Sequence, residues 1–234
     1  MPEVLRASAD GRFAVVRTEA GMADALAAIQ EASFPTLSPG ELMRPEHFRA
    51  HVGVFPEGQH AVVETATGRV VASATDLRTQ VDFAHFHHRY LDAVGGNWLT
   101  THDPQGDWLY GADIGVHPDY RGRGLALALY AARQELVWTL GLEGQVTAGM
   151  MSGYGAVKDR MSAEEYYEGL VAGRINDPTL SMQRRVGFEF RGLLKDYLQD
   201  PVCDNYSVLI VLDAARDVEG AVRPGAAREP SEGV

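Results

Sequence analysis

The segment from residue 113 to residue 126 constrains the fold more than any other part of this chain. Its sequence is Asp-Ile-Gly-Val-His-Pro-Asp-Tyr-Arg-Gly-Arg-Gly-Leu-Ala, and it continues an apolar stretch that begins at Trp108. That stretch predicts a strand, which Pro118 ends, and residues 125–140 carry apolar side chains at helical spacing. A strand, a glycine-rich turn and a long helix in succession are typical of an α/β domain.

The turn at 121–124 has the groups expected of an anion-binding site. Gly122 and Gly124 have no Cβ, so a ligand can approach their backbone closely. The start of the next helix exposes free N–H groups and the positive end of the helix dipole. Arg121 and Arg123 add cationic groups, which matters in a chain of formal net charge −11. The turn therefore predicts a phosphate or pyrophosphate site, the alternative being a surface turn with solvated arginines.

Composition excludes several classes of function. A net charge of −11 argues against a nucleic-acid coat and against a polybasic membrane binder. The longest apolar run, 124–132, is too short to span a membrane, and we expect no secretory signal in the first residues. The single cysteine, Cys203, excludes disulfide scaffolds and multi-thiolate zinc sites. We expect a cytoplasmic protein.

A histidine cluster at 85–88 invites a metal site, but only His85 and His88 share a helical face. We therefore expect no metal, and favour a helix over 81–94 that lines the acceptor side.

The remaining pattern predicts one α/β domain around a mixed sheet, over residues 1–212. Residues 152–177 form a helical insert, because Ser162 and Glu165 make a capping box, and residues 213–234 predict a flexible tail. Further strands are expected at 13–16, 60–64, 69–74, 145–150, 188–194 and 206–212, and further helices at 22–32 and 180–186.

The central segment resembles the core motif of the GNAT superfamily of acyl-CoA-dependent N-acyltransferases. Val116-His-Pro118 matches the V-x-P that ends a strand in that family, and Arg121, Gly124 and Ala126 match the following Q/R-x-x-G-x-G/A. The stretches that end at Asp113 and Glu165 are also similar to the acetyltransferase-like domain that some bacterial proteins carry fused to a nitrilase-type hydrolase.

The resemblance implies a mixed, mostly antiparallel sheet with helices on both faces and two splayed central parallel strands. It implies that acetyl-CoA is the acyl donor, with its pantetheine arm between the strands at 114–116 and 145–150 and its pyrophosphate on 121–126. The residues that it assigns to binding the donor are Ile114, Gly115, Val116, Arg121, Gly122, Arg123, Gly124, Leu125 and Ala126.

The chemistry needs a base for the amine and an acid for the departing thiolate. Many relatives use a tyrosine four residues before the Gly-Phe that ends the last helix, but this chain has Gln183 there. We expect Asp113 to be the base and a tyrosine of the insert, Tyr154, to be the acid. His102 precedes the donor strand and is a candidate substrate contact. A structural carboxylate at Asp113 and a local turn around His102 are the alternatives.

The expected function is an N-acetyltransferase that acts on a primary amine, in a small molecule or a peptide. The net charge of −11 favours a cationic acceptor. Two alternatives remain open: a non-catalytic acyl-CoA sensor, suggested by Gln183, and an interaction scaffold that uses the insert. A homodimer is expected by analogy alone.

Overall fold

The computed structural model describes residues 2–224. Its strands are β1 (Val4–Ala7), β2 (Phe13–Arg17), β3 (Gln59–Glu64), β4 (Val70–Thr79), β5 (Trp108–Val116), β6 (Gly144–Met150), β7 (Glu189–Leu194) and β8 (Ser207–Asp213). Its α-helices are α1 (Ala23–Ser33), α2 (Pro45–Val54), α3 (Tyr90–Ala93), α4 (Leu125–Leu140), α5 (Ala163–Val171) and α6 (Leu180–Val186). Short 3-10 helices occur at Ala20–Met22, Pro56–Gly58, Pro118–Tyr120 and Tyr154–Ala156.

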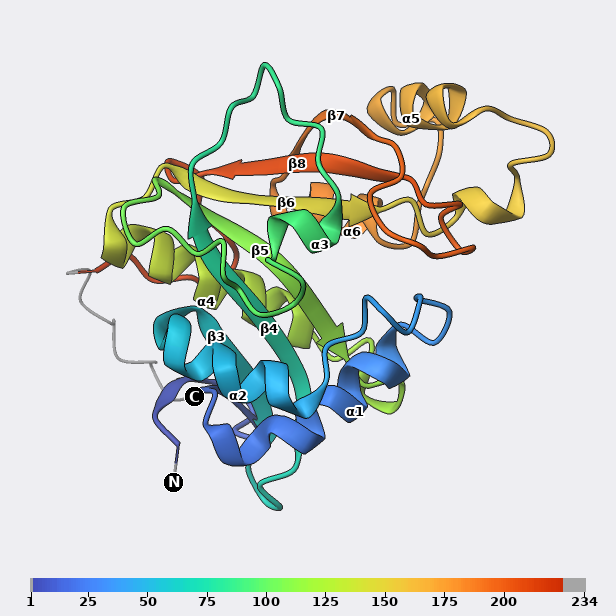
Figure 1. The fold of residues 1–234 in the computed structure, drawn as a ribbon. Helices are drawn as coiled ribbons and strands as arrows, with labels where there is room; N and C mark the ends of the chain where they lie inside the picture. The colour runs from blue at the N-terminus through green and yellow to red at the C-terminus, as the bar shows by residue number, and fades with distance from the viewer. Residues whose placement is uncertain (1, 225–234) are drawn as a thin grey trace, which may run out of the picture.

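The eight strands form one sheet in the order β1-β2-β3-β4-β5-β6-β8-β7. Only β5 and β6 run parallel, and all other neighbours are antiparallel. Helices α1 and α2 cover one face of the sheet and α4 crosses the other (Figure 1). The expected mixed, mostly antiparallel sheet with helices on both faces is confirmed.

Helix α4 forms where the sequence predicts a long amphipathic helix. Leu125, Leu129 and Ala132 are buried against the strands and recur at spacings of four and three residues. Glycines in the left-handed conformation flank both ends of the helix, Gly124 with φ 75° and Gly141 with φ 65°. Gly124 therefore fixes the direction in which α4 leaves the turn, and with it the position of the first free N–H groups.

The insert between β6 and α6 is tied to the body of the protein through one buried carboxylate. The capping box that opens α5 is present, with Ser162 and Glu165 bonding each other's backbone N–H groups. Asp177 accepts hydrogen bonds from the Gly153 amide at 2.8 Å and from the Tyr166 hydroxyl at 2.9 Å. These bonds hold both ends of the insert beside the start of α6.

Two local predictions are wrong. The helix expected over 81–94 is reduced to α3, because residues 80–89 form a loop whose position depends on long-range contacts such as the bond from the Tyr90 amide to the Tyr197 carbonyl at 2.7 Å. Strand β1 was not expected, because its alternation is short and it lies at the edge of the sheet.

Residues 214–224 differ from the expected flexible tail, because they pack along α4. The Trp138 indole donates to the Ala214 carbonyl at 2.7 Å, and the Arg223 guanidinium lies 4.4 Å from the centre of the Trp138 ring. Val218 is buried in the main core. Residues 225–234, the rest of that predicted tail, lie outside the described residues.

Candidate active site

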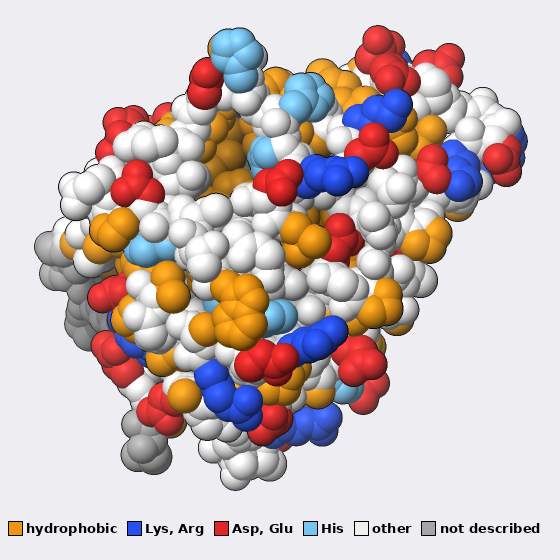
Figure 2. Space-filling model, in the orientation of Figure 1, with side chains coloured by type: hydrophobic (Ala, Val, Ile, Leu, Met, Phe, Trp, Pro, Cys, Tyr) orange, Lys and Arg blue, Asp and Glu red, His pale blue; other side chains and the backbone are white. Residues whose placement is uncertain are grey.

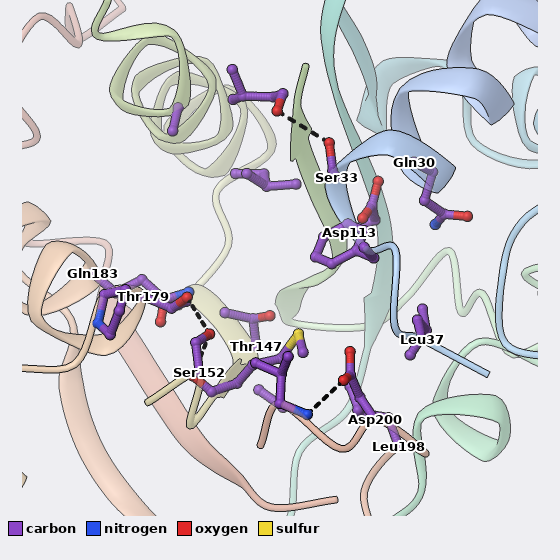
Figure 3. Close-up of a pocket in the computed structure, with 18 of the residues that line it drawn as sticks. Gln30, Ser33, Leu37, Asp113, Thr147, Ser152, Thr179, Gln183, Leu198 and Asp200 are labelled. Carbon is purple, nitrogen blue, oxygen red and sulfur yellow. Dashed lines mark hydrogen bonds between the residues drawn. The ribbon is translucent and has the colours of Figure 1, made fainter. Parts of the chain in front are cut away.

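A gap opens in the middle of the sheet where β5 and β6 separate. The two strands pair only over Trp108–Gly111 with Gly144–Thr147. Beyond that point β5 pairs with β4 alone, and β6 with β8 alone. A cavity of about 660 Å³ lies at the separation (Figure 3) and also reaches α1, α3, α4, α6 and the loop that includes Tyr197. The splayed parallel strands expected from the sequence are present.

A β-bulge in β5 determines which side chains face this cavity. Asp76 pairs with Gly111 and Thr75 pairs with Asp113, so Ala112 is an extra residue in the ladder. Before the bulge, Gly111 faces Arg133 of α4; after it, Asp113 turns to the opposite face, toward α1. The bulge thus places one carboxyl group at the point where the strands part.

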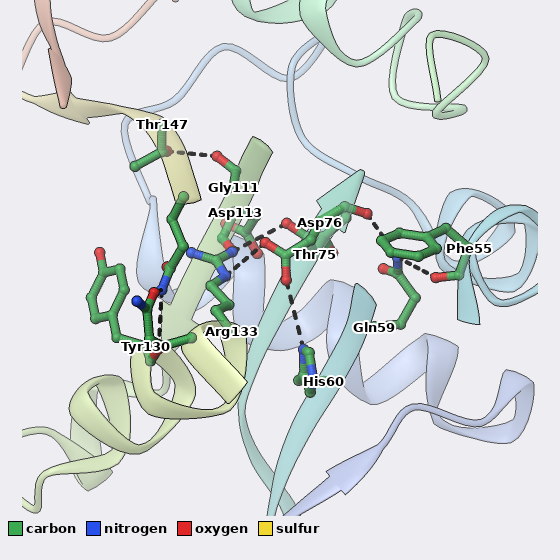
Figure 4. Close-up of polar contacts among 12 residues, drawn as sticks. Phe55, Gln59, His60, Thr75, Asp76, Gly111, Asp113, Tyr130, Arg133 and Thr147 are labelled. Atoms are coloured by element: carbon green, nitrogen blue, oxygen red, sulfur yellow. Dashed lines mark hydrogen bonds and ion pairs between the residues drawn. The ribbon is translucent and has the colours of Figure 1, made fainter. Parts of the chain in front are cut away.

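A buried ion network supports the bulge from the α4 side (Figure 4). Arg133 Nη2 donates to the carbonyl oxygens of Asp113 at 2.5 Å and of Thr75 at 3.2 Å. Arg133 Nε lies 2.7 Å from Asp76 Oδ1, and Asp76 Oδ2 lies 3.6 Å from His60 Nδ1. Arg133 and Asp76 therefore neutralise each other on the α4 face of the sheet. The Asp113 carboxyl lies on the α1 face and has no salt-bridge partner among the described residues.

The Asp113 carboxyl has the properties of a proton acceptor. It is 8% exposed, it lines the cavity, and its Oδ2 has no hydrogen-bond partner among the described residues. Burial raises its pKa to about 7, an effect that the charge of Arg133 and the amide of Gln30 partly offset. The Met43 amide donates to Gln30 Oε1, so the Gln30 NH₂ group is left for Asp113. A carboxyl group that titrates near neutrality is suited to general base catalysis.

The glycine turn lies at the opposite end of the cavity. Gly122 adopts φ 74°, and a Cβ built on it would meet no atom within 4 Å, so its backbone faces open space. Arg121 donates to the Ser33 carbonyl at 3.2 Å and to the Val116 carbonyl at 3.4 Å, which ties the turn to α1 and β5. The open backbone of this turn and the free N–H groups of the first turn of α4 have the chemistry that suits an anion.

The structure brings together five of the nine residues that the sequence analysis assigned to donor binding. The residues among them that line the cavity are Ile114, Val116, Arg121, Gly122 and Ala126. Gly115 faces α1, and Leu125 is buried in the core. Arg123 turns away, since it donates to the Asp119 carbonyl at 3.2 Å and lies 5.1 Å from the Tyr120 ring centre.

Tyr154 and His102 do not belong to the cavity wall. Tyr154 is buried between Tyr166 and Tyr206, with ring centroids 5.5 and 5.6 Å away. His102 stacks on Phe55 at 4.6 Å, and its Nδ1 accepts the backbone N–H of Arg78. Neither side chain meets Asp113 in this structure.

Sequence reasoning missed a tyrosine that lines the cavity from α4. The Gln183 amide donates to the Tyr130 hydroxyl at 2.9 Å, and Tyr130 is 2% exposed. Since Gln183 supplies the donor, the hydroxyl hydrogen of Tyr130 is free to point elsewhere. The signal was in the sequence: Ala126, Tyr130 and Arg133 recur at spacings of four and three, so they share one face of α4.

Two further tyrosines complete the wall on the α1 side. Tyr90 of α3 and Tyr197 are both buried and both line the cavity. The pKa of Tyr90 is raised well above its usual value by burial, with the carboxyl of Asp113 as the next contribution. No spacing in the sequence links these residues, because they lie in a one-turn helix and a distant loop.

Comparison with known proteins identifies the family. Residues 64–150 match the family model described as "Acetyltransferase (GNAT) family". The chain is 33% identical to the uncharacterized N-acetyltransferase YkwB of Bacillus subtilis (strain 168), over 79% of this chain and 81% of YkwB. The chain belongs to the GNAT acetyltransferase family.

Two other matches extend the comparison with the GNAT family. The chain is 31% identical to the "Probable hydrolase YhcX" of the same strain, over 76% of this chain, and it spans about a third of that relative, 34% of its length. A solved structure described as "GphF GNAT-like decarboxylase in complex with isobutyryl-CoA" has the same fold, with a TM-score of 0.65, 20% identity, and coverage of 86% of this chain and 98% of GphF.

Membership in the GNAT acetyltransferase family and the similarity to YkwB support acyl-CoA-dependent acyl transfer by this chain. Within residues 2–224, no three or more His, Cys, Asp or Glu side chains are grouped so that they could hold a metal ion. Across the same residues, every helix is too short or too polar to cross a membrane.

Proposed function

We propose that this protein transfers an acetyl group from acetyl-CoA to a primary amine. The observation that carries the proposal is the Asp113 carboxyl at the point where β5 and β6 part, whose Oδ2 has no hydrogen-bond partner among the described residues. An amine must lose a proton as it attacks a thioester, and this carboxyl group is available to accept one. The description of the matching family and the name of YkwB support acetyl as the acyl group.

The residues of the glycine turn fit the phosphates of the donor. Gly122 leaves open space beside its backbone, and Ala126 lies in the first turn of α4, where N–H groups point toward the cavity entrance. Arg121 supplies the cation that an anionic ligand needs in a protein of net charge −11. These residues would hold the donor, and the thioester is the bond that the reaction breaks.

The acceptor side of the cavity favours a cation. Asp113 and Asp200 are buried in its wall, and neither forms a salt bridge with another described residue. Of the two arginines in the wall, Arg133 pairs with Asp76, and Arg121 lies at the glycine turn. An ammonium group entering between α1 and the Tyr197 loop would therefore meet negative charge.

Tyr130 is the best-placed acid for the departing thiolate. Burial raises its pKa, so the hydroxyl keeps its proton at neutral pH, and Gln183 bonds only its oxygen. In the balanced reaction, the nitrogen–carbon bond forms, the carbon–sulfur bond breaks, and the sulfur gains one proton. We therefore infer that Tyr130 supplies that proton in place of Tyr154.

Calorimetric titration with acetyl-CoA, in parallel with a thiol-release assay over a panel of amines, tests the proposal. Binding that weakens in Arg121→Ala but not in Arg123→Ala, together with release of CoA that depends on the amine, supports it. Binding without turnover would make the protein an acyl-CoA sensor. A parallel incubation with malonyl-CoA that releases CO₂ would instead indicate a decarboxylase, as the name of GphF describes. An absence of binding at millimolar ligand would overturn the site itself.

A further inference from the structure

A continuous chain of hydrogen bonds runs outward from the wall of the cavity. Tyr197 lines the cavity, and its hydroxyl oxygen lies 2.8 Å from the hydroxyl of Tyr110. The Tyr110 hydroxyl lies 2.8 Å from His88 Nε2, and His88 Nδ1 lies 2.7 Å from the Phe86 carbonyl. Tyr197 and Tyr110 are buried, whereas His88 is partly exposed.

The carbonyl at the outer end fixes the direction of every hydrogen in this chain. A carbonyl oxygen can only accept, so Nδ1 of His88 must carry a hydrogen. In the neutral ring Nε2 then has a lone pair, and the Tyr110 hydroxyl donates to it. The Tyr110 oxygen is thereby left to accept from Tyr197. All three hydrogens point away from the cavity, and the Tyr197 oxygen keeps a free lone pair.

The fold places this chain next to the proposed base. The bulge at Ala112 brings Tyr110 and Asp113 to the same face of β5 although they are three residues apart. The ring of Tyr90 packs against that of Tyr197, and the charge of Asp113 contributes to the raised pKa of Tyr90. The outer end lies in the loop between β4 and α3, which projects above the sheet (Figure 1), and histidine side chains gather on that side of the surface (Figure 2).

Acetylation of an ammonium acceptor releases protons, and groups in the cavity must accept them. The ammonium nitrogen has three protons and the product amide nitrogen has one, so two protons must leave. Asp113 accepts one of them as the nitrogen–carbon bond forms, Tyr130 gives one to the CoA sulfur, and the proton held by Asp113 then replaces the one that Tyr130 lost. The other has to pass from the cavity to solvent, because a net proton is released for each acetyl group transferred.

We propose that Tyr197, Tyr110 and His88 form a proton relay that carries this second proton from the acceptor ammonium to solvent. The inference rests on the proposed function. The ammonium gives a proton to the Tyr197 oxygen, Tyr197 gives its own to Tyr110, and Tyr110 gives its own to His88 Nε2. His88 becomes an imidazolium and releases its Nδ1 proton to water. Proton exchange at the ring then restores the Nδ1–H tautomer and the starting directions of both hydroxyls before the next turnover. Tyr110 and His88 act through Tyr197 and do not touch the acceptor.

The surroundings of His88 suit proton release. Burial lowers the pKa of the imidazole, and His87 lowers it further, while the Phe86 carbonyl and Asp92 raise it. The rings of Tyr110 and Tyr197 pack against the imidazole at 5.7 and 5.5 Å. These are the groups that face it, and the lowered pKa means that a proton received at neutral pH is passed on rather than kept.

The first arm of the test measures the tautomer of His88 in the ligand-free protein by ¹⁵N NMR of the imidazole nitrogens. We expect the Nδ1–H tautomer at neutral pH, with an Nε2 signal that shifts in Tyr110→Phe and stays in place in His85→Gln, since His85 is exposed. An Nε2–H tautomer would reverse the hydrogen bonds and overturn the relay. This arm needs no substrate, so it stands whether or not an amine is acetylated.

The second arm compares kcat/KM across pH for Tyr110→Phe and His88→Gln, with His85→Gln and Tyr167→Phe as matched controls. Below the pKa of the acceptor amine we expect a loss of about tenfold or more in both relay variants. Above that pKa the free amine has one proton fewer to lose, so the loss should shrink. A loss that is equal at every pH indicates a structural role and contradicts the relay. If the wild type acetylates no amine at any pH, the proposed function fails instead, and the NMR arm still decides the direction of the relay.

Discussion

Arg133 Nη2 donates to the carbonyl oxygen of Asp113 at 2.5 Å, from the face of β5 opposite to the Asp113 carboxyl. The Arg133 side chain thus supports the bulge from the α4 face of the sheet, and the same side chain neutralises Asp76. Arg133→Met should cost about 3–5 kcal/mol in the free energy of unfolding, because it leaves a buried carboxylate without its cation. Urea unfolding measures this loss, and the double variant with Asp76→Leu should recover much of it. A single variant as stable as the wild type would contradict the network.

Asp113→Asn should lower kcat/KM by about 10²–10⁴-fold, the usual contribution of a general base. In the wild type, kcat/KM should rise with pH through a limb near 7, because burial raises the pKa of Asp113 to about 7 and only the carboxylate can take a proton. Asp113→Asn should not show this rise of kcat/KM near pH 7. Steady-state rates between pH 5 and 9 test this, and an unchanged profile would remove Asp113 from the chemistry.

The same carboxyl group should make stability depend on pH. Its pKa is about 7 in the folded protein and 3.8 in the unfolded chain, so the folded state holds the proton more tightly. Its contribution to stability is fully present below pH 3.8 and is lost as the pH rises through 7. Urea unfolding at pH 5 and pH 8 should therefore show a larger decline for the wild type than for Asp113→Asn. Equal declines would mean that the carboxyl group is ionised throughout this range.

Gly122→Ala should weaken acetyl-CoA binding by about tenfold, because a Cβ would obstruct the backbone N–H groups that face the phosphates. Gly141→Ala is the matched control. Both glycines have φ near 70° and open space around them, so alanine strains both by about 1–2 kcal/mol. Calorimetry should show weaker binding for Gly122→Ala alone. Equal affinities in the two variants would place the phosphates elsewhere.

Tyr130→Phe should lower kcat by about 10²-fold if its hydroxyl protonates the thiolate. Tyr154→Phe should leave kcat within about twofold, since that side chain packs between other aromatic rings outside the cavity. Thermal unfolding of both variants checks that the fold survives. The acyl donor offers a further readout. A thioester of a more acidic thiol has a leaving group that needs no proton, so this donor should restore much of the kcat that Tyr130→Phe loses. A full loss of activity in Tyr154→Phe would restore the insert tyrosine as the acid.

The sequence was most informative where local chemistry determines the structure. Gly122 and Gly124 adopt left-handed conformations that glycine favours, and Leu125, Leu129 and Ala132 of α4 pack against the strands at the spacing of the predicted helix. The turn and the helix could therefore be predicted from adjacent residues, whereas the splay of β5 from β6 was expected only from the resemblance to the GNAT superfamily. The same holds for the capping box at Ser162.

The site residues that were not predicted from the sequence come together through contacts between distant segments. Tyr90, Tyr130 and Tyr197 meet at one cavity only because α3, α4 and a late loop converge there. The bulge at Ala112 also reverses the alternation of β5, and no regular period predicts such an inserted residue. His102 and Tyr154 were candidate site residues because of their positions along the chain, but their neighbours in space are Phe55 and Tyr166.

The short parallel pairing of β5 with β6 divides the sheet into two antiparallel blocks, β1 to β5 and β6 to β7. Only Trp108–Gly111 and Gly144–Thr147 join them within the sheet, and the Thr147 hydroxyl closes this seam with a bond of 2.6 Å to the Gly111 carbonyl. Helix α4 packs against β2 to β5 of one block and against β6 of the other, so this helix holds the two blocks together where the ladder does not. The width of the cavity beyond Gly111 therefore depends on the packing of α4, whose Tyr130 also lines it.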